Sequence, residues 1–364
     1  MSADFLTDLL HWYDRAAANL PWRYTTADPP PAYHVWLSEI MLQQTQVETV
    51  IPYYLRFLDA FPDVHALAAA PLDDVLKLWE GLGYYSRARH LHKTAQIVSS
   101  EYGGQFPRTA AELQKLPGIG RYTAGAIASI AFNEAAPVLD GNVIRVFARL
   151  LDLPDDVSRA QTQSRLWAQA DAWVPDTCPG DYNQSLMELG RTVCKPRNPL
   201  CDTCPIQAHC RAYAAGTVHE RPVKKKKAPT PHYDVAAGIV YRADGRFLIA
   251  QRPAEGLLGG LWEFPGGKQE PGENLPETLQ RELNEELAID VEVGALFTVV
   301  KHAFTHFKIT LHAFECRIAN GTQPQAIEAQ AIAWVTLDEV NRYSFGKADR
   351  EIITALRDRQ DMLF

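Results

Sequence analysis

Four cysteines within a stretch of 17 residues constrain this chain more than any other feature of its sequence. Their spacing is Cys-x6-Cys-x2-Cys-x5-Cys, at Cys194, Cys201, Cys204 and Cys210. Four thiolates this close together can bind one soft metal centre, either zinc or a 4Fe-4S cluster. Zinc sites usually consist of two Cys-x2-Cys knuckles separated by a longer loop, so the x6 and x5 spacings favour the cluster. Disulfides are the weakest alternative, because residues 1–17 lack the features of a secretory signal and we expect a reducing compartment.

The spacing of apolar residues changes near residue 220. The chain's 364 residues are enough for two or three domains. Apolar residues recur at helical spacing up to about residue 215, with frequent Pro and Gly breaks, which predicts an all-α region over 1–220. The segment RPVKKKKAPTPH, 221–232, predicts an exposed linker; a nuclear signal is the alternative for its lysines. Residues 233–364 mix strand and helix patterns and predict an α+β domain. No apolar stretch approaches the ~20 residues of a membrane span.

The net charge of −8 neither supports nor excludes a nucleic-acid partner. An acidic protein can bind DNA through a local basic surface or through backbone amides, because phosphates need donors only where the strand passes. Lys195 and Arg197 lie between the first two cysteines of the cluster. A metal centre there would hold two cations on a rigid loop. Cys178 and Cys316 fall outside the pattern and are expected to be small buried hydrophobes.

The segment LPGIGRYTAGA, 116–126, predicts a hairpin within a helix-hairpin-helix over 112–130. Gly118 and Gly120 would let the backbone approach a phosphate, at which the amides of the next helix N-terminus point. Asp140 follows about 20 residues later, in LDGNVIRV. The alternative is an ordinary helix-turn-helix in which Asp140 is only a helix N-cap.

The segment HVWLSEIMLQQTQVETV, 34–50, places Trp36, Glu39 and Leu42 on one stripe of a helix. Burial among apolar neighbours would raise the pKa of Glu39 and keep it protonated near neutral pH, as a general acid requires. A protonated Glu39 and an ionised Asp140 would form a pair of carboxyl groups with different roles. The alternative for Glu39 is a surface glutamate on an amphipathic helix.

These motifs, in this order, resemble the MutY-type adenine glycosylases of the endonuclease III superfamily over nearly the whole chain. The resemblance implies a monofunctional base excision repair enzyme that flips out and hydrolyses adenine mispaired with 8-oxoguanine or guanine. Glu39 would protonate adenine N7, and Asp140 would stabilise the oxocarbenium ion along a retaining course. The lyases of the superfamily carry a Schiff-base lysine where this chain has Tyr122, which implies base removal alone. Tyr122 and Asn142 would lie near the sugar.

The same resemblance assigns further residues to DNA and to the two bases. Gln44 would wedge into the stack, while Thr45, Leu82 and Tyr84 would surround the 8-oxoguanine. The adenine pocket would be formed by Trp22, Arg23 and Glu188, and DNA phosphate would be met by Gly118, Gly120, Lys195 and Arg197. Core packing is the alternative for Trp22, Leu82 and Tyr84. The segment TTADPPPAY, 25–33, is longer than its usual counterpart, which affects the alignment at Arg23.

The C-terminal region carries a Nudix pattern from Gly267 that is complete except for Ala288, which replaces the last glycine. Such a helix would set Glu282, Glu285 and Glu286 to bind magnesium, so hydrolysis of modified nucleoside triphosphates is a second hypothesis. Behind a glycosylase, however, a Nudix-like domain resembles the 8-oxoguanine recognition domain of the MutY family.

In that recognition domain the segment HAFTHF supplies the contacts, here Phe304, Thr305 and His306. The Thr305 hydroxyl can accept a hydrogen bond from N7–H, which 8-oxoguanine has and guanine lacks. An unspecialised strand pair is the alternative for this segment.

A third hypothesis, a noncatalytic DNA-binding module, leaves Glu39 and Asp140 unexplained. We therefore expect a monomeric, cytoplasmic enzyme at the nucleoid, of bacterial type, with a 4Fe-4S cluster and double-stranded DNA as its partner.

Overall fold

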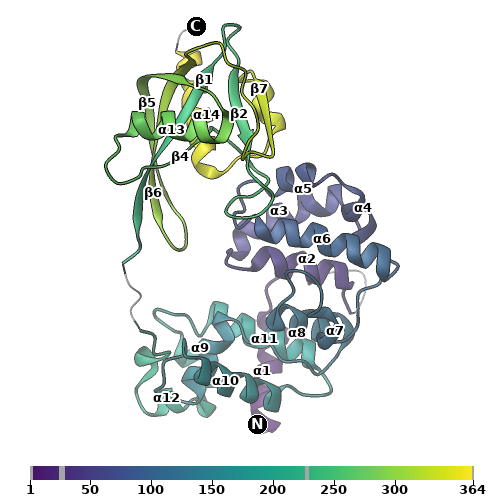
Figure 1. The fold of residues 1–364 in the computed structure, drawn as a ribbon. Helices are drawn as coiled ribbons and strands as arrows, with labels where there is room; N and C mark the ends of the chain where they lie inside the picture. Colours follow the sequence, from purple (N-terminus) through teal and green to yellow (C-terminus); the bar gives the residue numbers. More distant parts are fainter. Residues whose placement is uncertain (1–2, 24–28, 226–228, 363–364) are drawn as a thin grey trace. The chain divides into compact units, whose positions relative to one another are not determined.

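The computed structural model describes residues 3–23, 29–225 and 229–362 and divides the chain into two compact units (Figure 1). The first unit comprises Met1–Ala69 and His90–Lys227, and the second comprises Ala70–Arg89 and Ala228–Phe364. Part of the predicted linker, 226–228, and part of the segment 25–33 lie outside the described residues. Within the described ranges, no helix is long and apolar enough to cross a membrane.

The first unit is built from short helices, as the Pro and Gly breaks predicted. Its helices are α1 (Ala3–Ala16), α2 (Ala32–Leu42), α3 (Val47–Ala60), α4 (Val64–Ala69), α6 (Ser86–Glu101, whose first turn belongs to the second unit), α7 (Ala110–Leu113), α8 (Arg121–Phe132), α9 (Gly141–Leu150), α10 (Ala160–Trp173), α11 (Pro179–Thr192) and α12 (Arg211–Ala214). Short 3-10 turns cover Cys201–Thr203, Gln207–His209 and Val218–Glu220. Apolar side chains of α1, α9, α10 and α11 form one core, which also contacts three of the four clustered cysteines.

The helix-hairpin-helix predicted over 112–130 corresponds to α7, a tight turn and α8. Gly118 has a φ of +74°, and a Cβ there would lie 2.6 Å from the Cβ of His90, so only glycine fits. Gly125 brings α8 against the chain that leads into α9, since a Cβ at this position would lie 2.1 Å from the Pro137 carbonyl oxygen. These close approaches place the start of α9, and with it Asp140, beside α8.

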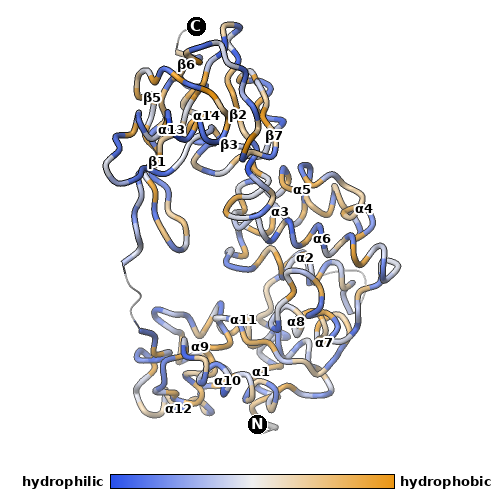
Figure 2. Tube along the Cα trace, in the orientation of Figure 1, coloured by the Kyte–Doolittle hydropathy of each residue, from blue (hydrophilic) through white to orange (hydrophobic). Residues whose placement is uncertain are grey.

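The second unit is a seven-stranded mixed sheet between two helices. Its strands are β1 (His232–Tyr241), β2 (Phe247–Gln251), β3 (Trp262–Glu263), β4 (Gly266–Lys268), β5 (Val291–Ala303), β6 (Lys308–Ile318) and β7 (Ala331–Val335). The order is β3-β2-β1-β6-β5, with β4 on β1 and β7 on β2; β1 and β6 are parallel, and the other pairs are antiparallel. Apolar residues concentrate on β1 and β2 (Figure 2), and β2 and residues 236–240 of β1 are buried on both faces.

Each face of the sheet has its own core. Helix α13 (Leu275–Leu287) packs Leu279, Leu283 and Leu287 on one face, while α14 (Lys347–Asp361) packs Ile352 and Ile353 on the other. Alternate residues of β1 point to the two cores, as the two-residue period of a strand requires. An all-α region followed by an α+β domain is therefore confirmed.

Residues 70–89, which include α5 (Leu72–Trp79), belong to the second unit although they come early in the chain. Arg89 Nη1 donates to the Gly259 carbonyl oxygen at 2.6 Å, and Leu76 lies against Gly260. These contacts fix the segment on the loop between β2 and β3. No sequence pattern had separated it from the helical region.

Candidate active site

A cavity of about 670 Å³ in the helical unit contains most of the predicted catalytic and adenine-binding residues. This volume lies within the range of small-molecule sites. Helices α2, α8, α9 and α11 supply most of the lining. The predicted residues present in it are Trp22, Arg23, Glu39, Gln44, Thr45, Tyr122, Asp140, Asn142 and Glu188. Their roles remain predictions, but the fold brings them to one place.

Glu39 lies in the middle of α2 and is only 6 % exposed. The pKa of its carboxyl is raised to about 7, chiefly by burial and also by the Asp140 carboxylate, while the Tyr122 hydrogen bond and the Arg23 charge oppose the rise. The carboxyl is therefore about half protonated at neutral pH and can give a proton to a base in the cavity. The surface-glutamate alternative for Glu39 does not describe this buried side chain.

Tyr122, in the first turn of α8, donates its hydroxyl proton to Glu39 Oε2 at 2.6 Å. Its hydroxyl also lies 3.1 Å from Met187 Sδ. Burial raises the pKa of the phenol well above its usual value, and the carboxylates of Glu39 and Asp140 raise it further. Tyr122 thus remains a donor and orients the Glu39 carboxyl.

Asp140 is the N-cap of α9, and its Oδ1 accepts from the Val143 backbone N–H at 2.7 Å. Asn142 Nδ2 donates to Oδ2 at 2.9 Å. Burial raises the pKa of Asp140, while these hydrogen bonds and the Arg145 charge favour its ionised form. The N-cap role and a catalytic role are compatible, because the cap occupies only one carboxylate oxygen.

Arg145 connects the Asp140 region to the cysteine loop, a link that the sequence did not indicate. Its Nη2 donates to Asn142 Oδ1 at 2.9 Å and to the Gly190 carbonyl oxygen at 2.6 Å, and its Nε donates to the Cys194 carbonyl oxygen at 2.7 Å. The side chain is 8 % exposed. A change in the cysteine loop can therefore reach Asn142 through one guanidinium group.

Another arginine, Arg149, one turn further along α9 and 2 % exposed, lies against the cysteines themselves. Its Nη1 donates to Cys194 Sγ at 3.2 Å and to the Lys195 carbonyl oxygen at 2.8 Å. Buried guanidinium groups facing thiolates reduce the cost of burying negative charge.

The residues predicted for adenine form one wall of the cavity. Trp22 is 7 % exposed and packs edge-on against Tyr54, with ring centroids 5.3 Å apart. Arg23 Nη2 lies 3.2 Å from Glu188 Oε2, and Arg191 Nη2 lies 2.6 Å from Glu188 Oε1. Glu188 is 1 % exposed, so its carboxylate is committed to two arginines. Core packing, the alternative for Trp22, describes that side chain equally well.

Helix α11 also presents residues to the cavity that the sequence analysis missed, namely Gln184, Met187 and Arg191. Gln184 lies four residues before Glu188 and Arg191 three residues after it, while Met187 lies three residues after Gln184 and four before Arg191. This helical spacing was the signal that could have found them. Gln184 carries both an amide donor and an acceptor, which suits the edge of a nucleobase.

Gln44 and Thr45 line the cavity directly after the end of α2. Gln44 has a φ of +58°, a left-handed conformation that costs a non-glycine residue about 1–2 kcal/mol. The neighbouring Gln43 donates from Nε2 to Thr123 Oγ1 at 3.1 Å and so anchors the turn on α8. Such local strain, held by its surroundings, is common at functional sites.

The four cysteines surround a small separate cavity, together with Arg149, Leu200 and Tyr213. Burial raises the pKa of Cys204 to about 12 and also raises the pKa of Cys201 and Cys210, so thiolates here require positive charge from a metal centre. Four cysteines around one cavity, at the spacing Cys-x6-Cys-x2-Cys-x5-Cys, fit a cluster whose irons each take a different thiolate.

The residues predicted for DNA phosphate lie at the surface of the same unit. Lys195 and Arg197 are exposed on the loop between the first two cysteines. Gly118 and Gly120 lie in the hairpin before α8, and Gly120 is the N-cap of that helix. A Cβ at Gly120 would meet nothing within 4 Å, which leaves open space in front of the α8 amides.

The residues predicted for 8-oxoguanine lie in the second unit. Phe304, Thr305 and His306 form the turn between β5 and β6, which a hydrogen bond from Phe304 N–H to the Phe307 carbonyl oxygen closes at 2.8 Å. The Tyr84 hydroxyl lies 3.0 Å from Thr305 Oγ1. Tyr84 is 42 % exposed, whereas Leu82 is 5 % exposed, as its core-packing alternative expects.

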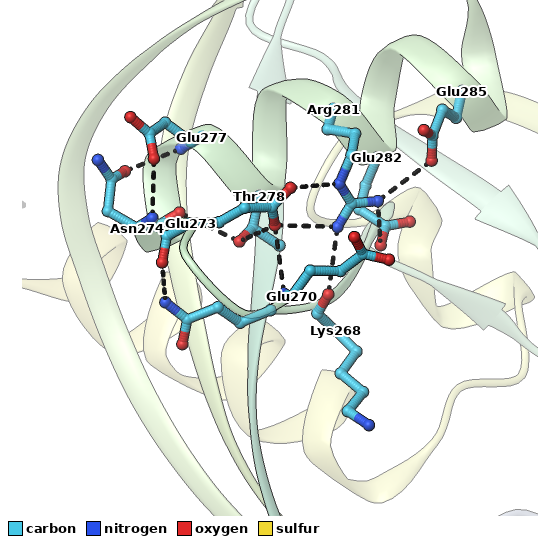
Figure 3. A network of polar contacts seen from close by, with 10 residues as sticks. Lys268, Glu270, Glu273, Asn274, Glu277, Thr278, Arg281, Glu282 and Glu285 are labelled. Carbon is cyan, nitrogen blue, oxygen red and sulfur yellow. Dashed lines mark hydrogen bonds and ion pairs between the residues drawn. The ribbon is translucent and has the colours of Figure 1, made fainter.

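The Nudix helix α13 holds its acidic residues around Arg281 (Figure 3). Arg281 binds Glu273 at 2.6 Å, Glu282 at 3.0 Å and Glu285 at 3.1 Å. Of the three carboxylates predicted to bind magnesium, Arg281 pairs with Glu282 and Glu285, and hydrolysis of modified nucleoside triphosphates stays a prediction. Ala288, with a φ of +53°, occupies the left-handed position where the Nudix pattern has glycine.

Comparison with known families agrees with this description of both units. Residues 37–171 match the HhH-GPD superfamily of base excision DNA repair proteins. Residues 194–210 match the iron-sulfur binding domain of endonuclease III, and residues 236–355 match the NUDIX domain. The cavity, the cysteine loop and the C-terminal sheet thus define a base excision repair glycosylase with an iron-sulfur cluster and a NUDIX domain. All four predicted cluster ligands lie within the residues that match the iron-sulfur binding domain, so the predicted iron-sulfur cluster is confirmed.

Relatives that match most of the chain identify the family within this class. The adenine DNA glycosylase of Homo sapiens is 37 % identical, over 98 % of this chain and 74 % of the relative. That of Buchnera aphidicola subsp. Schizaphis graminum (strain Sg) is 41 % identical, over 71 % of this chain and 73 % of the relative. A solved thermostable thymine-DNA glycosylase is 27 % identical with a TM-score of 0.51, covering 58 % of this chain and 95 % of that chain. The chain belongs to the adenine DNA glycosylase family.

Proposed function

We propose that this adenine DNA glycosylase removes adenine mispaired with 8-oxoguanine or guanine, with Glu39 as general acid and Asp140 as the stabiliser of the sugar cation. The observation that carries the proposal is the buried Glu39 carboxyl, whose pKa is raised to about 7 and whose hydrogen-bond donor is Tyr122. Protonation of adenine N7 makes the base a better leaving group. A buried acid poised near neutral pH supplies that proton efficiently.

The positive charge that develops on the sugar as the bond breaks requires an anion beneath it. Asp140 keeps one oxygen in the α9 cap, while Asn142 and Arg145 favour its ionised form. The two carboxyl groups then differ in charge: Glu39 gives a proton and Asp140 remains negative. Tyr122 has no amine, so no Schiff base forms at this position, and water completes the reaction.

DNA would be held by backbone amides and by cations on fixed loops. The open space before the α8 amides suits a phosphate, and Lys195 and Arg197 supply charge in an otherwise acidic chain. Gln44, in its left-handed conformation at the cavity, would fill the space that the flipped adenine leaves. A monomer at the nucleoid of a bacterial cytoplasm is part of the same proposal.

Recognition of 8-oxoguanine would depend on the proton of Thr305. A threonine hydroxyl has one proton. When it donates that proton to the Tyr84 oxygen 3.0 Å away, it can only accept toward the base. It then pairs with N7–H of 8-oxoguanine and has nothing to offer the bare N7 of guanine.

The deciding experiment uses a duplex with one adenine opposite 8-oxoguanine, followed by alkali, which cuts at abasic sites. We expect strand cleavage only after alkali. An intact strand would refute the proposed activity, while cleavage without alkali would indicate a lyase and refute the role assigned to Tyr122.

A further inference from the structure

The segment 70–89 is held on the C-terminal domain by polar contacts that converge on one carboxylate, Glu80. Its Oε1 accepts from the Phe345 backbone N–H at 2.9 Å and from Arg350 Nε, and its Oε2 accepts from Lys77 Nζ at 2.9 Å. Lys77 and Arg350 also donate to the Tyr343 carbonyl oxygen, at 3.0 Å and 2.7 Å. The Glu80 and Arg350 side chains are only 19 % and 23 % exposed. This half-buried network is more than an isolated surface ion pair.

The turn that follows Glu80 connects this polar network to Tyr84. Trp79 Nε1 donates to the Gly83 carbonyl oxygen at 3.0 Å, and the Tyr85 hydroxyl donates to the Phe345 carbonyl oxygen at 3.3 Å. Tyr84 itself has a φ of +50°, which costs about 1–2 kcal/mol for a non-glycine residue. A strained backbone persists only where its surroundings determine it. Phe345 is therefore fixed from both of its backbone polar groups, one by Glu80 and one by Tyr85.

We propose that Glu80 is a positioning residue for lesion specificity: it fixes the turn 80–85 so that the Tyr84 hydroxyl meets Thr305. This inference rests on the proposed function of Tyr84 and Thr305. A hydrogen bond of 3.0 Å is lost when its partners separate by about 1 Å. Once Tyr84 moves away, the Thr305 proton is free to point at the N7 of guanine, and the preference for 8-oxoguanine falls.

The test is Glu80→Gln, which keeps an acceptor for the Phe345 N–H and removes the charge that Arg350 requires. Single-turnover excision is measured on duplexes with adenine opposite 8-oxoguanine and opposite guanine. We expect the ratio of the rate opposite 8-oxoguanine to the rate opposite guanine to fall about tenfold, because a charge-assisted hydrogen bond is lost and the freed Thr305 proton no longer disfavours guanine. Glu80→Asp should recover part of the ratio. Glu255→Gln, at an exposed glutamate of the same unit, is the matched control and should change neither rate.

A double-mutant comparison identifies the route of the effect. In a Tyr84→Phe background the Tyr84 hydroxyl is already absent, so Glu80→Gln should cause no further loss of the ratio. An unchanged ratio in Glu80→Gln, an equal fall on both substrates, or full additivity with Tyr84→Phe would each overturn the proposal. If the wild type excised no adenine, the proposed function would fail instead. Amide hydrogen exchange then decides: faster exchange at 80–85 and Phe345 in Glu80→Gln supports the anchor, and unchanged exchange refutes it.

Discussion

Replacement of Glu39 by Gln separates the chemistry of the active site from the stability of the fold. Glutamine has nearly the same shape and can still accept from Tyr122, but it has no proton to give. General acids contribute about 10²- to 10⁴-fold in rate, so we expect excision in Glu39→Gln to fall by about 10³-fold. Binding to the mispaired duplex should remain close to that of the wild type, because the side chain lies inside the cavity.

The pH dependence of the wild type follows from the same carboxyl. Glu39 must be protonated, and its pKa is raised to about 7, so the single-turnover rate should fall about fivefold between pH 7 and pH 8 as most of the group ionises. At acid pH the rate should also fall, because Asp140 must be ionised and burial raises its pKa. Glu39→Gln should lack the alkaline limb. A fall above pH 7 in that variant, or near-normal excision, would refute the general-acid assignment.

Although Glu39→Gln should reduce the excision rate, it should increase the free energy of unfolding at alkaline pH. Because the pKa of Glu39 rises from 4.5 unfolded to about 7 folded, the folded state holds an extra proton between these values and loses stability as pH rises through them. At 1.36 kcal/mol for each pKa unit, the buried charge costs about 3 kcal/mol at pH 8. Urea unfolding should therefore find Glu39→Gln more stable than the wild type at pH 8, with little difference at pH 4.5. Glu101→Gln, at an exposed glutamate of the same unit, should show no such pH-dependent gain.

Three further predictions concern the rest of the site. Asp140→Asn should reduce single-turnover excision by at least about 10²-fold while the asparagine still caps α9, so an unchanged thermal melt with unchanged excision would contradict the assignment. Gly118→Ala should lower the free energy of unfolding by about 2 kcal/mol or more, since its φ is +74° and the new Cβ would meet His90; a neutral effect in urea would refute this account of the hairpin. Lys195→Ala should weaken binding to matched and mispaired duplexes alike and reduce the slope of log affinity against log salt by about one, and a loss confined to mispaired DNA would contradict a phosphate contact.

The sequence by itself determined the features that depend on local spacing. The four cysteines, the glycines of the hairpin, the stripe with Glu39 and the Nudix pattern each occupy a few neighbouring turns, and their periods can be counted along the chain. The class of protein and its cluster followed from these motifs. The change from helical to strand period near residue 220 likewise separated the helical region from the α+β domain, because side-chain period is a local property of backbone geometry.

Only the tertiary structure decided which distant groups face one another. Tyr122 reaches Glu39 across 83 positions of the chain, and without that packing neither the raised pKa nor its donor could be assigned. The segment 70–89 joins a domain that begins about 140 residues later, through Glu80 and Arg350. Arg281 pairs with Glu282 and Glu285, two of the three carboxylates that the sequence offered to magnesium. Burial and ion pairing arise from the whole fold, so residue spacing cannot specify them.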